Sequence, residues 1–311
     1  MKAVRIHNYG DVDTLGYEDA PMPEPGPADV RVRVHAAAVN PVDWKIRAGY
    51  LAEMIPYKMP LTLGWDMSGV VEQVGAEVTH LSVGDEVYSR PDIARDGSYA
   101  EYMVVRASEV AAKPETLSHN EAAAVPLAGL TAWQALFDHA QLKQGERVLV
   151  HAGAGGVGSF AIQFAKWAGA HVIATASSAN EALIRDLGAD EFVDYRSQRF
   201  EEVLAKVDVV LDTIGGDTQA RSIQLLNSGG RLFSVVAAPD EASLAAVGAT
   251  GGIFMVQPSS KDLGHIAKLI DDGTVRVLID SVFPLSEARA AHTRSQTGRA
   301  RGKIVLEVVP A

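Results

Sequence analysis

The sequence predicts an α/β fold with two parts, a β-rich domain and a doubly wound parallel sheet, on three observations. A strand-like run at residues 147–151 leads into a glycine-rich turn and then a helix-period segment. Strand and helix patterns alternate after it, as expected for a parallel sheet with right-handed crossovers. Residues 1–110 instead show short strand patterns separated by many turns, which is typical of a compact β-rich domain.

The β-rich part begins with a strand pattern at residues 1–6. Residues 30–36 alternate valine with other residues, which is the period of a half-buried strand. Residues 69–75 and 84–88 predict shorter strands beside glycines, and residues 21–27 predict a proline-rich loop.

The alternating part predicts strands at residues 147–151, 171–175, 207–212 and 230–236, with an edge strand at 253–256. The helices expected between them cover residues 159–168, 181–187 and 218–226. A helix at residues 263–271 and a final strand at 304–309 follow. No helix follows this last strand, so it is expected to rejoin the sheet of the first part.

Composition limits the possible functions. A chain of 311 residues is too long for one ordinary core, and 47% hydrophobic with 22% charged residues is typical of a soluble globular protein. The net charge of −11 disfavours nucleic acid or an anionic membrane as the main partner. The absence of cysteine excludes disulfides, thiolate nucleophiles and cysteine-ligated zinc. No signal peptide or membrane span is recognisable, so a cytoplasmic location is expected.

The glycine-rich turn has the spacing G-x-G-x-x-G at Gly153, Gly155 and Gly158. In a strand–turn–helix setting the first glycine permits the tight turn and the second lets the backbone approach a pyrophosphate. The third glycine lets helix and strand pack closely, and the helix N-terminus favours the phosphate charge. The motif therefore predicts a dinucleotide site.

Several ordered motifs extend this interpretation over nearly the whole chain: residues 40–49 (NPVDWKIRAG), 64–71 (GWDMSGVV), 125–132 (VPLAGLTA), 152–158 (AGAGGVG), 187–190 (LGAD), 209–216 (VVLDTIGG) and 301–306 (RGKIVL). Together they resemble the zinc-independent quinone oxidoreductase branch of the medium-chain dehydrogenase/reductase superfamily. The resemblance implies a GroES-like catalytic domain formed by residues 1–123 and 259–311, and a Rossmann NADPH-binding domain formed by residues 124–258. It also implies a cleft where nicotinamide meets substrate, and a homodimer through the Rossmann sheet edge.

Zinc is not expected. The zinc alcohol dehydrogenases that resemble this chain use an early Cys, a Gly-His-Glu segment and a later Cys or acid. The matching positions here lie near Asn40, at residues 64–66 and at 127–129, and among them only Asp66 is a ligand type. A catalytic zinc site requires three protein ligands, and the nine histidines show no ligand spacing. No metal site is therefore predicted.

Metal-free chemistry needs an acceptor that spreads charge onto its oxygen, so a quinone or an α,β-unsaturated carbonyl is expected to take hydride from a nicotinamide. The catalytic candidates are Asn40, Asp43 and Tyr50. Asn40 either donates its amide N–H to the substrate oxygen or nicotinamide, or caps the following turn. Asp43 either steers a proton, orienting Lys45 or a water, or is the N-cap of a helix at residues 44–48. Tyr50 is a possible hydroxyl donor that closes the pocket.

The residues after the strand predicted at 171–175 indicate whether the cofactor is NADPH or NADH. An NAD-specific site usually has an acid there, and none occurs before Glu181. Ser177 and Ser178 can donate to a 2′-phosphate, so NADPH is expected rather than NADH. The resemblance adds Tyr195 beside that phosphate, Lys303 as a possible cation, and Thr131 beside the nicotinamide unless its hydroxyl bonds its own helix. Its remaining cofactor positions are Asn40, Gly156, Val157, Asp212, Thr213, Ala237, Phe254, Val256 and Arg301.

The function expected is NADPH-dependent hydride transfer to quinones or to enals and enones, with a small-molecule substrate and no membrane or nucleic-acid partner. Two alternatives stay open. One is a secondary-alcohol dehydrogenase, against which the missing zinc ligands speak. The other is a non-catalytic NADPH-binding redox sensor.

Overall fold

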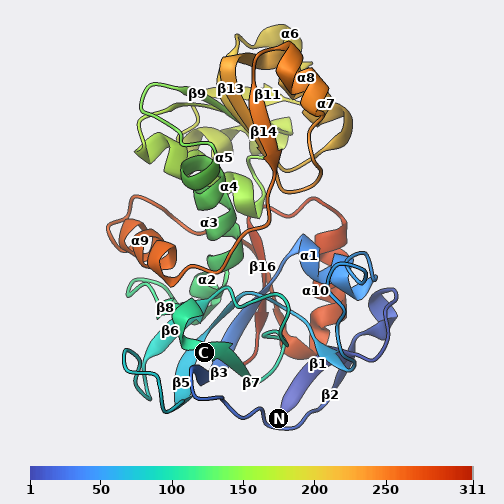
Figure 1. Ribbon diagram of the computed structural model, residues 1–311, viewed down its shortest axis with the longest axis vertical. Coiled ribbons are helices and arrows are strands. Elements are labelled where there is room, and N and C mark those ends of the chain that lie inside the picture. Colours follow the sequence, from blue (N-terminus) through green and yellow to red (C-terminus); the bar gives the residue numbers. More distant parts are fainter. Residues whose placement is uncertain (310–311) are drawn as a thin grey trace. The chain divides into compact units, whose positions relative to one another are not determined.

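The computed structural model describes residues 1–309, and the chain forms two compact units. The first unit contains residues 1–130 together with the chain from Gln257 onward, and the second contains Thr131–Val256. Helix α3 (Pro126–Trp133) includes the boundary between them. Figure 1 shows the helices and strands of each unit.

The first unit is built on a seven-stranded sheet with the order β15-β16-β3-β5-β6-β8, in which β7 also pairs with β3. Its strands are β3 (Asp29–Val39), β5 (Met67–Val74), β6 (Glu86–Ser89), β7 (Tyr102–Arg106), β8 (Val110–Ala112), β15 (Ile279–Pro284) and β16 (Lys303–Glu307). A smaller sheet has the order β2-β1-β4, from β1 (Lys2–Ile6), β2 (Gly16–Asp19) and β4 (Leu61–Thr62). The final strand therefore joins the sheet of the first part, as the sequence predicts.

The alternation of buried valines with more exposed residues explains why β3 forms. Val30, Val32 and Val34 are buried, whereas the side chains between them are less buried. Beyond Val34 the strand is buried almost continuously, because both of its faces are covered. Backbone partners lie on both sides, with β5 and β7 along its first part and β16 along its end.

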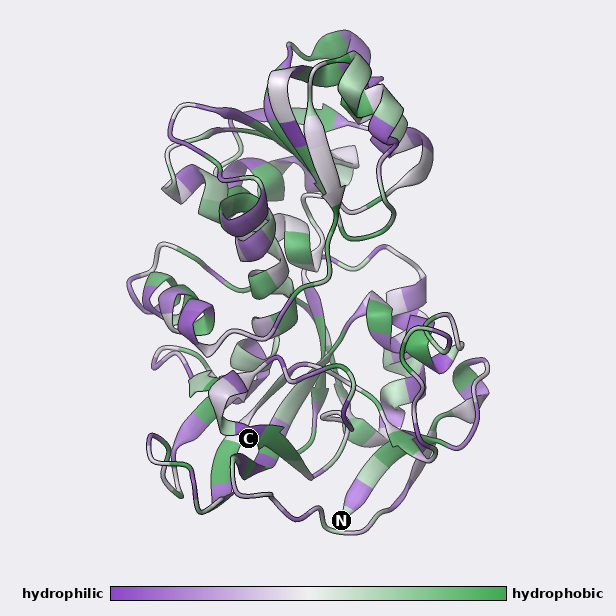
Figure 2. Cartoon of the chain, viewed as in Figure 1, coloured by the Kyte–Doolittle hydropathy of each residue, from purple (hydrophilic) through white to green (hydrophobic). Residues whose placement is uncertain are grey.

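The helices of the first unit are α1 (Pro41–Arg47), α2 (His119–Ala123), α9 (Ser260–Asp271) and α10 (Ala288–Gln296). Short 3-10 turns are η1 (Val12–Thr14), η2 (Ala107–Glu109) and η5 (Leu285–Glu287). Helix α9 alternates hydrophobic and hydrophilic residues along its length (Figure 2). Its apolar face is buried, and the Ser259 side chain accepts a hydrogen bond from the Asp262 N–H at its start.

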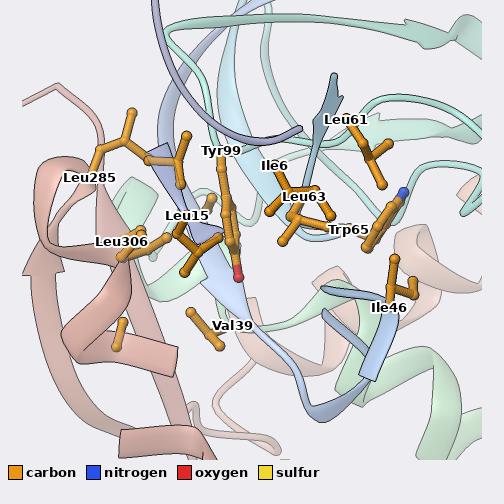
Figure 3. Packing of buried hydrophobic residues seen from close by; sticks show 14 of the residues in the cluster. Ile6, Leu15, Val39, Ile46, Leu61, Leu63, Trp65, Tyr99, Leu285 and Leu306 are labelled. Atoms are coloured by element: carbon orange, nitrogen blue, oxygen red, sulfur yellow. The ribbon is translucent and has the colours of Figure 1, made fainter. Parts of the chain in front are cut away.

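One hydrophobic cluster of the first unit contains Tyr99 and Trp65. The ring of Tyr99 stands among Ile6, Leu15 and Leu63, and the indole of Trp65 lies farther along the same cluster (Figure 3). Each of these side chains is at most 2% exposed. Full burial of one such side chain contributes about 1.5–3 kcal/mol, so this cluster fixes the elements around it.

The second unit is a six-stranded parallel sheet with the order β11-β10-β9-β12-β13-β14. Its strands are β9 (Arg147–Val150), β10 (His171–Ala176), β11 (Glu191–Asp194), β12 (Val207–Asp212), β13 (Leu226–Ser234) and β14 (Thr250–Ile253). Numbered within the unit, this order is 3-2-1-4-5-6, the doubly wound dinucleotide-binding order. The predicted fold class is confirmed.

Helices connect these strands. They are α4 (Gly156–Trp167), α5 (Glu181–Asp186), α6 (Phe200–Val203), α7 (Gly216–Leu225) and α8 (Glu241–Ala246), with a π-helical turn η3 (Gln134–His139) and a 3-10 turn η4 (Ser178–Asn180). The expected helices are present, although α4 begins three residues earlier than predicted. Strand β11 was not predicted. The predicted edge strand is misplaced, because the edge strand is β14 and contains two glycines that hide its pattern.

Candidate functional site

Four polar residues lie at one end of the large sheet of the first unit, at or just beyond the ends of four neighbouring strands. Lys303 begins β16, Asn40 follows β3, Asp66 precedes β5, and Arg90 follows β6. The strand register explains the grouping, because Ile304 pairs with Val39 and Met67 pairs with Ser89. The next residues along each strand therefore meet across the sheet end. These four residues are here called the polar row.

Three members of the polar row are bonded to one another. Asp66 Oδ2 accepts from Asn40 Nδ2 at 2.8 Å and from Lys303 Nζ at 3.0 Å. The Lys303 ammonium also donates to Asn40 Oδ1. All three residues are at most 4% exposed. One N–H of the Asn40 amide is thus engaged by Asp66, and the whole amide is held in one orientation.

Burial raises the pKa of Asp66, while Lys303, Asn40 and the Leu127 amide oppose this shift. The Leu127 N–H donates to the second carboxylate oxygen at 2.5 Å. The predicted role of Lys303 as a cation for a 2′-phosphate requires correction. Its ammonium is buried and paired with Asp66, so it is not an exposed phosphate-binding group.

Asp43 closes the start of helix α1. Its Oδ2 accepts from the Asn40 backbone N–H at 2.8 Å and from the Tyr99 hydroxyl at 2.7 Å. The helix begins at Pro41, so Asn40 is the N-cap and the prediction of Asp43 as the N-cap is wrong by three residues. Asp43 Oδ1 is buried without a hydrogen-bond partner among residues 1–309. Burial raises the pKa of Asp43 to about 7.

A continuous set of side chains leads from Asp43 toward the surface. The Tyr99 hydroxyl lies 3.2 Å from His292 Nε2, and His292 Nδ1 lies 3.1 Å from an Arg47 nitrogen. Arg47 in turn donates to the exposed Gln296 at 3.3 Å. Burial lowers the pKa of His292 to about 3, so this ring is neutral near pH 7. The Arg47 guanidinium can donate to it only because the ring is neutral.

We expect Asp43→Asn to gain stability relative to the unchanged chain as pH rises. The folded-state pKa of about 7 lies above the usual 3.8, so the folded chain holds a proton that the unfolded chain releases between these values. The stability that this proton provides is complete below about pH 4 and is lost as pH rises through 7. Asparagine carries no such proton. Urea unfolding of both chains at several pH values measures the difference.

Asp29→Asn is the matched control, because Arg95 holds the pKa of the Asp29 carboxyl below its usual value. Its stability difference from the unchanged chain should therefore stay constant above about pH 5. A constant difference for Asp43→Asn over the same range would show that Asp43 is already ionised in the folded chain.

Tyr50 lies just beyond α1 and is 73% exposed. Its ring meets Trp44 edge-on, with centroids 6.4 Å apart. Within the described chain it is therefore separate from the buried Asn40–Asp43 pair, and its assignment as a hydroxyl donor stays a prediction.

In the second unit, the three glycines of the turn differ in what surrounds them. A Cβ at Gly153 would lie 2.7 Å from Ile184, and one at Gly158 would lie 2.4 Å from the Ala152 carbonyl oxygen. A Cβ at Gly155 would meet only that same oxygen, at 3.3 Å. Backbone packing thus requires the third glycine and side chains crowd the first, while Gly155 is the least crowded of the three.

Helix α4 starts directly at the least crowded of these glycines. Gly155 is its N-cap, and the first amide bonded within the helix is that of Ser159, which donates to Gly155 at 2.9 Å. Gly156 and Val157, both half-buried, occupy the first turn, where amides precede the intrahelical bonds. Such a turn binds phosphate through its amides and the helix dipole. The residues present therefore fit a dinucleotide pyrophosphate.

Asp212 ends β12 and its carboxylate is already engaged. It accepts from the amides of Ile214 and Gly215 at 2.9 Å, from Gln219 at 2.9 Å and from Ser234 at 2.8 Å. These bonds hold the turn of residues 213–216 in place. The side chain thus shapes the loop, and any cofactor contact at this position falls to neighbouring backbone.

The end of β10 carries the residues expected at a 2′-phosphate. The Ser177 hydroxyl accepts from Asn180 at 3.2 Å, Tyr195 is 56% exposed, and the Arg196 guanidinium lies 5.8 Å from the Tyr195 ring centroid. Asp194 was missed by sequence reasoning. It pairs with Ala176 in the sheet register, and Ser178 is among the groups that lower its pKa, after the Arg196 amide.

The remaining predicted cofactor residues lie around the same sheet end or at the limits of the unit, except Arg301. Thr213 donates to the His151 carbonyl at 3.3 Å, the Ala237 carbonyl accepts from Gln219 at 2.9 Å, and the Phe254 ring lies 4.4 Å from that of His139. Thr131 is buried and Val256 is half-buried at the two ends of the unit. Arg301 belongs to the first unit, where its amide donates to Asp280 at 2.9 Å.

Residues 1–309 contain no group of three or more His, Cys, Asp or Glu side chains arranged to hold a metal ion. No helix in the same range is long and apolar enough to cross a membrane.

Known protein families and structures match both units of the chain. Residues 26–115 match the alcohol dehydrogenase GroES-like domain, and residues 187–306 match a family described as zinc-binding dehydrogenase. The 2-methylene-furan-3-one reductase of Solanum lycopersicum is 39% identical over 100% of this chain and 80% of its own. The human mitochondrial NAD(P)H oxidoreductase RTN4IP1 is 35% identical over 99% and 89%. The quinone oxidoreductase structure from Coxiella burnetii superposes with a TM-score of 0.94, 37% identity and 99% coverage of both chains.

The fold and these similarities define the class of protein: an oxidoreductase with a GroES-like domain and a Rossmann domain. The chain belongs to the quinone oxidoreductase branch of the medium-chain dehydrogenase/reductase superfamily.

Proposed function

We propose that this protein reduces quinones or α,β-unsaturated carbonyls with NADPH and without zinc. The observation that carries the proposal is the low crowding beside Gly155 at the N-terminus of α4, between two glycines with closer neighbours. Relatives named quinone oxidoreductase, NAD(P)H oxidoreductase and 2-methylene-furan-3-one reductase support the acceptor class. When bound, a reduced nicotinamide supplies the hydride.

The chain's own residues would bind the cofactor and orient the groups that contact the acceptor. Residues 155–158 hold the pyrophosphate, and the Asp212 carboxylate fixes the neighbouring turn. In the first unit, Lys303 and Asp66 fix the Asn40 amide, which leaves one amide N–H to donate to a ligand oxygen. Asp43, with a pKa of about 7, is suited to hold or release a proton near neutrality.

Zinc does not fit the polar row. An amide and one carboxylate are fewer than three strong ligands, and the ammonium of Lys303 occupies the carboxylate that would bind the metal. The zinc-binding description of the family matching residues 187–306 therefore does not extend to this donor set.

A homodimer through β14 and a cytoplasmic location complete the proposal. Strand β14 is the edge of the parallel sheet, and Ile253 on it is 52% exposed. An exposed apolar edge strand is suited to pairing with a second copy.

Oxidation of NADPH and of NADH, measured with a quinone panel and separately with an enal and enone panel, tests the function. Turnover that survives a zinc chelator supports it. Oxidation of secondary alcohols alone, or tight NADPH binding without any turnover, would favour the dehydrogenase or the redox sensor instead.

We expect Ser177→Asp to raise the KM for NADPH more than the KM for NADH. The motivation is the Ser177 hydroxyl at the end of β10, where a new carboxylate would repel a 2′-phosphate but accept a ribose hydroxyl. NADH serves as the internal control in the same variant. Equal effects on both nucleotides would refute the role of Ser177 at the 2′-phosphate.

A further inference from the structure

Arg90 is a buried arginine whose Nε has no hydrogen-bond partner among residues 1–309. The residue is 2% exposed. Within residues 1–309 its guanidinium forms no hydrogen bond or ion pair. A buried donor without an acceptor is costly, so its presence points to a ligand that completes it.

Within the polar row, Arg90 is the neighbour of Asp66. Met67 pairs with Ser89 across β5 and β6, so Arg90 and Asp66 are the next residues at the same sheet end. Burial lowers the pKa of Arg90, and Asp66 leads the charges that oppose this shift. Arg90 thus adjoins the group that fixes the Asn40 amide.

The charges near Arg90 already balance. The carboxylates that act on it are Asp66, Asp92 and Glu109, of which Asp66 pairs with Lys303 and the other two pair with Arg106. With Arg90 included, three cations therefore stand against three carboxylates. The deficit at Arg90 is therefore one of hydrogen-bond acceptors, which a carbonyl oxygen of a ligand can supply.

We propose that the Arg90 guanidinium binds the carbonyl oxygen of the quinone or enone acceptor. This inference rests on the proposed function. With an enone, hydride supplied by a bound reduced nicotinamide would form a C–H bond at the β carbon, and the displaced π electrons would move to the carbonyl oxygen to give an enolate. With a quinone, the hydride would form an O–H bond at one oxygen, and the electrons would move through the ring to the other oxygen to give a phenolate. In either case Arg90 stabilises the negative oxygen, and a proton from solvent then completes the reduced product.

Arg90→Met tests the assignment by its effect on turnover. Methionine fills a similar space but leaves three carboxylates with two cations, so the melting temperature is measured only to show that the variant folds. The kcat/KM for the acceptor is expected to fall about 100-fold, while the Kd for NADPH stays unchanged. Arg90→Lys keeps the charge but loses the forked donors and should recover part of the activity. Arg289→Met removes an arginine that is over half exposed and serves as the control.

A readout without turnover uses 4-nitrophenol, whose yellow anion reports its ionisation. The unchanged chain should lower the apparent pKa of the bound phenol, and Arg90→Met should abolish this effect while Arg289→Met retains it. An unaltered response of Arg90→Met to 4-nitrophenol overturns the role of Arg90.

Different results would contradict the proposed function and the proposed role of Arg90. If the unchanged chain reduces neither acceptor class, the proposed function fails, whereas the 4-nitrophenol titration still reports on Arg90. If turnover occurs and Arg90→Met leaves kcat/KM unaltered, only the assignment of Arg90 fails.

Discussion

Gly155→Val is expected to abolish binding of NADPH and NADH while the chain still folds. A Cβ at this position would lie 3.3 Å from the Ala152 oxygen, a tight contact but a far milder one than those at Gly158, so folding is expected to persist. The valine methyl groups would occupy the space in which a pyrophosphate must approach the first turn of α4. Titration calorimetry measures the loss, and the melting temperature reports on folding.

Gly158→Ala is the informative comparison. Its Cβ would lie 2.4 Å from a backbone oxygen and 2.7 Å from Gly153 Cα, so it should lower the melting temperature strongly. Gly264→Ala, in open space on α9, should change neither property. Retained nucleotide binding in Gly155→Val would contradict the assignment of residues 153–158 as the dinucleotide turn.

Lys303→Met is expected to destabilise the first unit by about 3–5 kcal/mol, because it leaves the buried Asp66 carboxylate without its cation. Asn40 would also lose the donor that orients its amide oxygen. Chemical denaturation monitored by tryptophan fluorescence measures the free energy of unfolding.

Two variants separate this effect from lost packing. Combining Lys303→Met with Asp66→Asn removes both charges, so it should be less destabilising than Lys303→Met alone. Lys166→Met breaks an exposed pair with Asp190 and should change stability by about 0–1 kcal/mol. If Lys303→Met and Lys166→Met have equal effects, the buried pair does not contribute as proposed.

The sequence predicts most of the second unit because each signal there is local. The period of residues 207–212 and the glycine spacing at residues 153–158 lie within single elements, and the structure has a strand and a turn at these positions. Strand β11 was not predicted because it has four residues and only one of them is buried. Strand β14 was misplaced because Gly251 and Gly252 carry no side chains to show a period.

The site in the first unit was less predictable, because its members meet only through strand register. Nothing local in the sequence shows that Lys303 contacts Asp66, 237 residues away. Arg90 was missed for the same reason, since an arginine after a strand is normally a surface residue. The signal that could have found it is Asp66 itself, because a buried carboxylate requires cations from neighbouring strands.

Strand β16 also affects how the chain folds during synthesis. The strands of the second unit come from one uninterrupted stretch, so that unit can fold before residues 257–309 have been synthesised. The first unit cannot, because β3 lacks one neighbour and Asp66 lacks its cation until residues 303–307 emerge. The nascent first unit thus keeps an open sheet edge beside β3 until residues 303–307 have been synthesised.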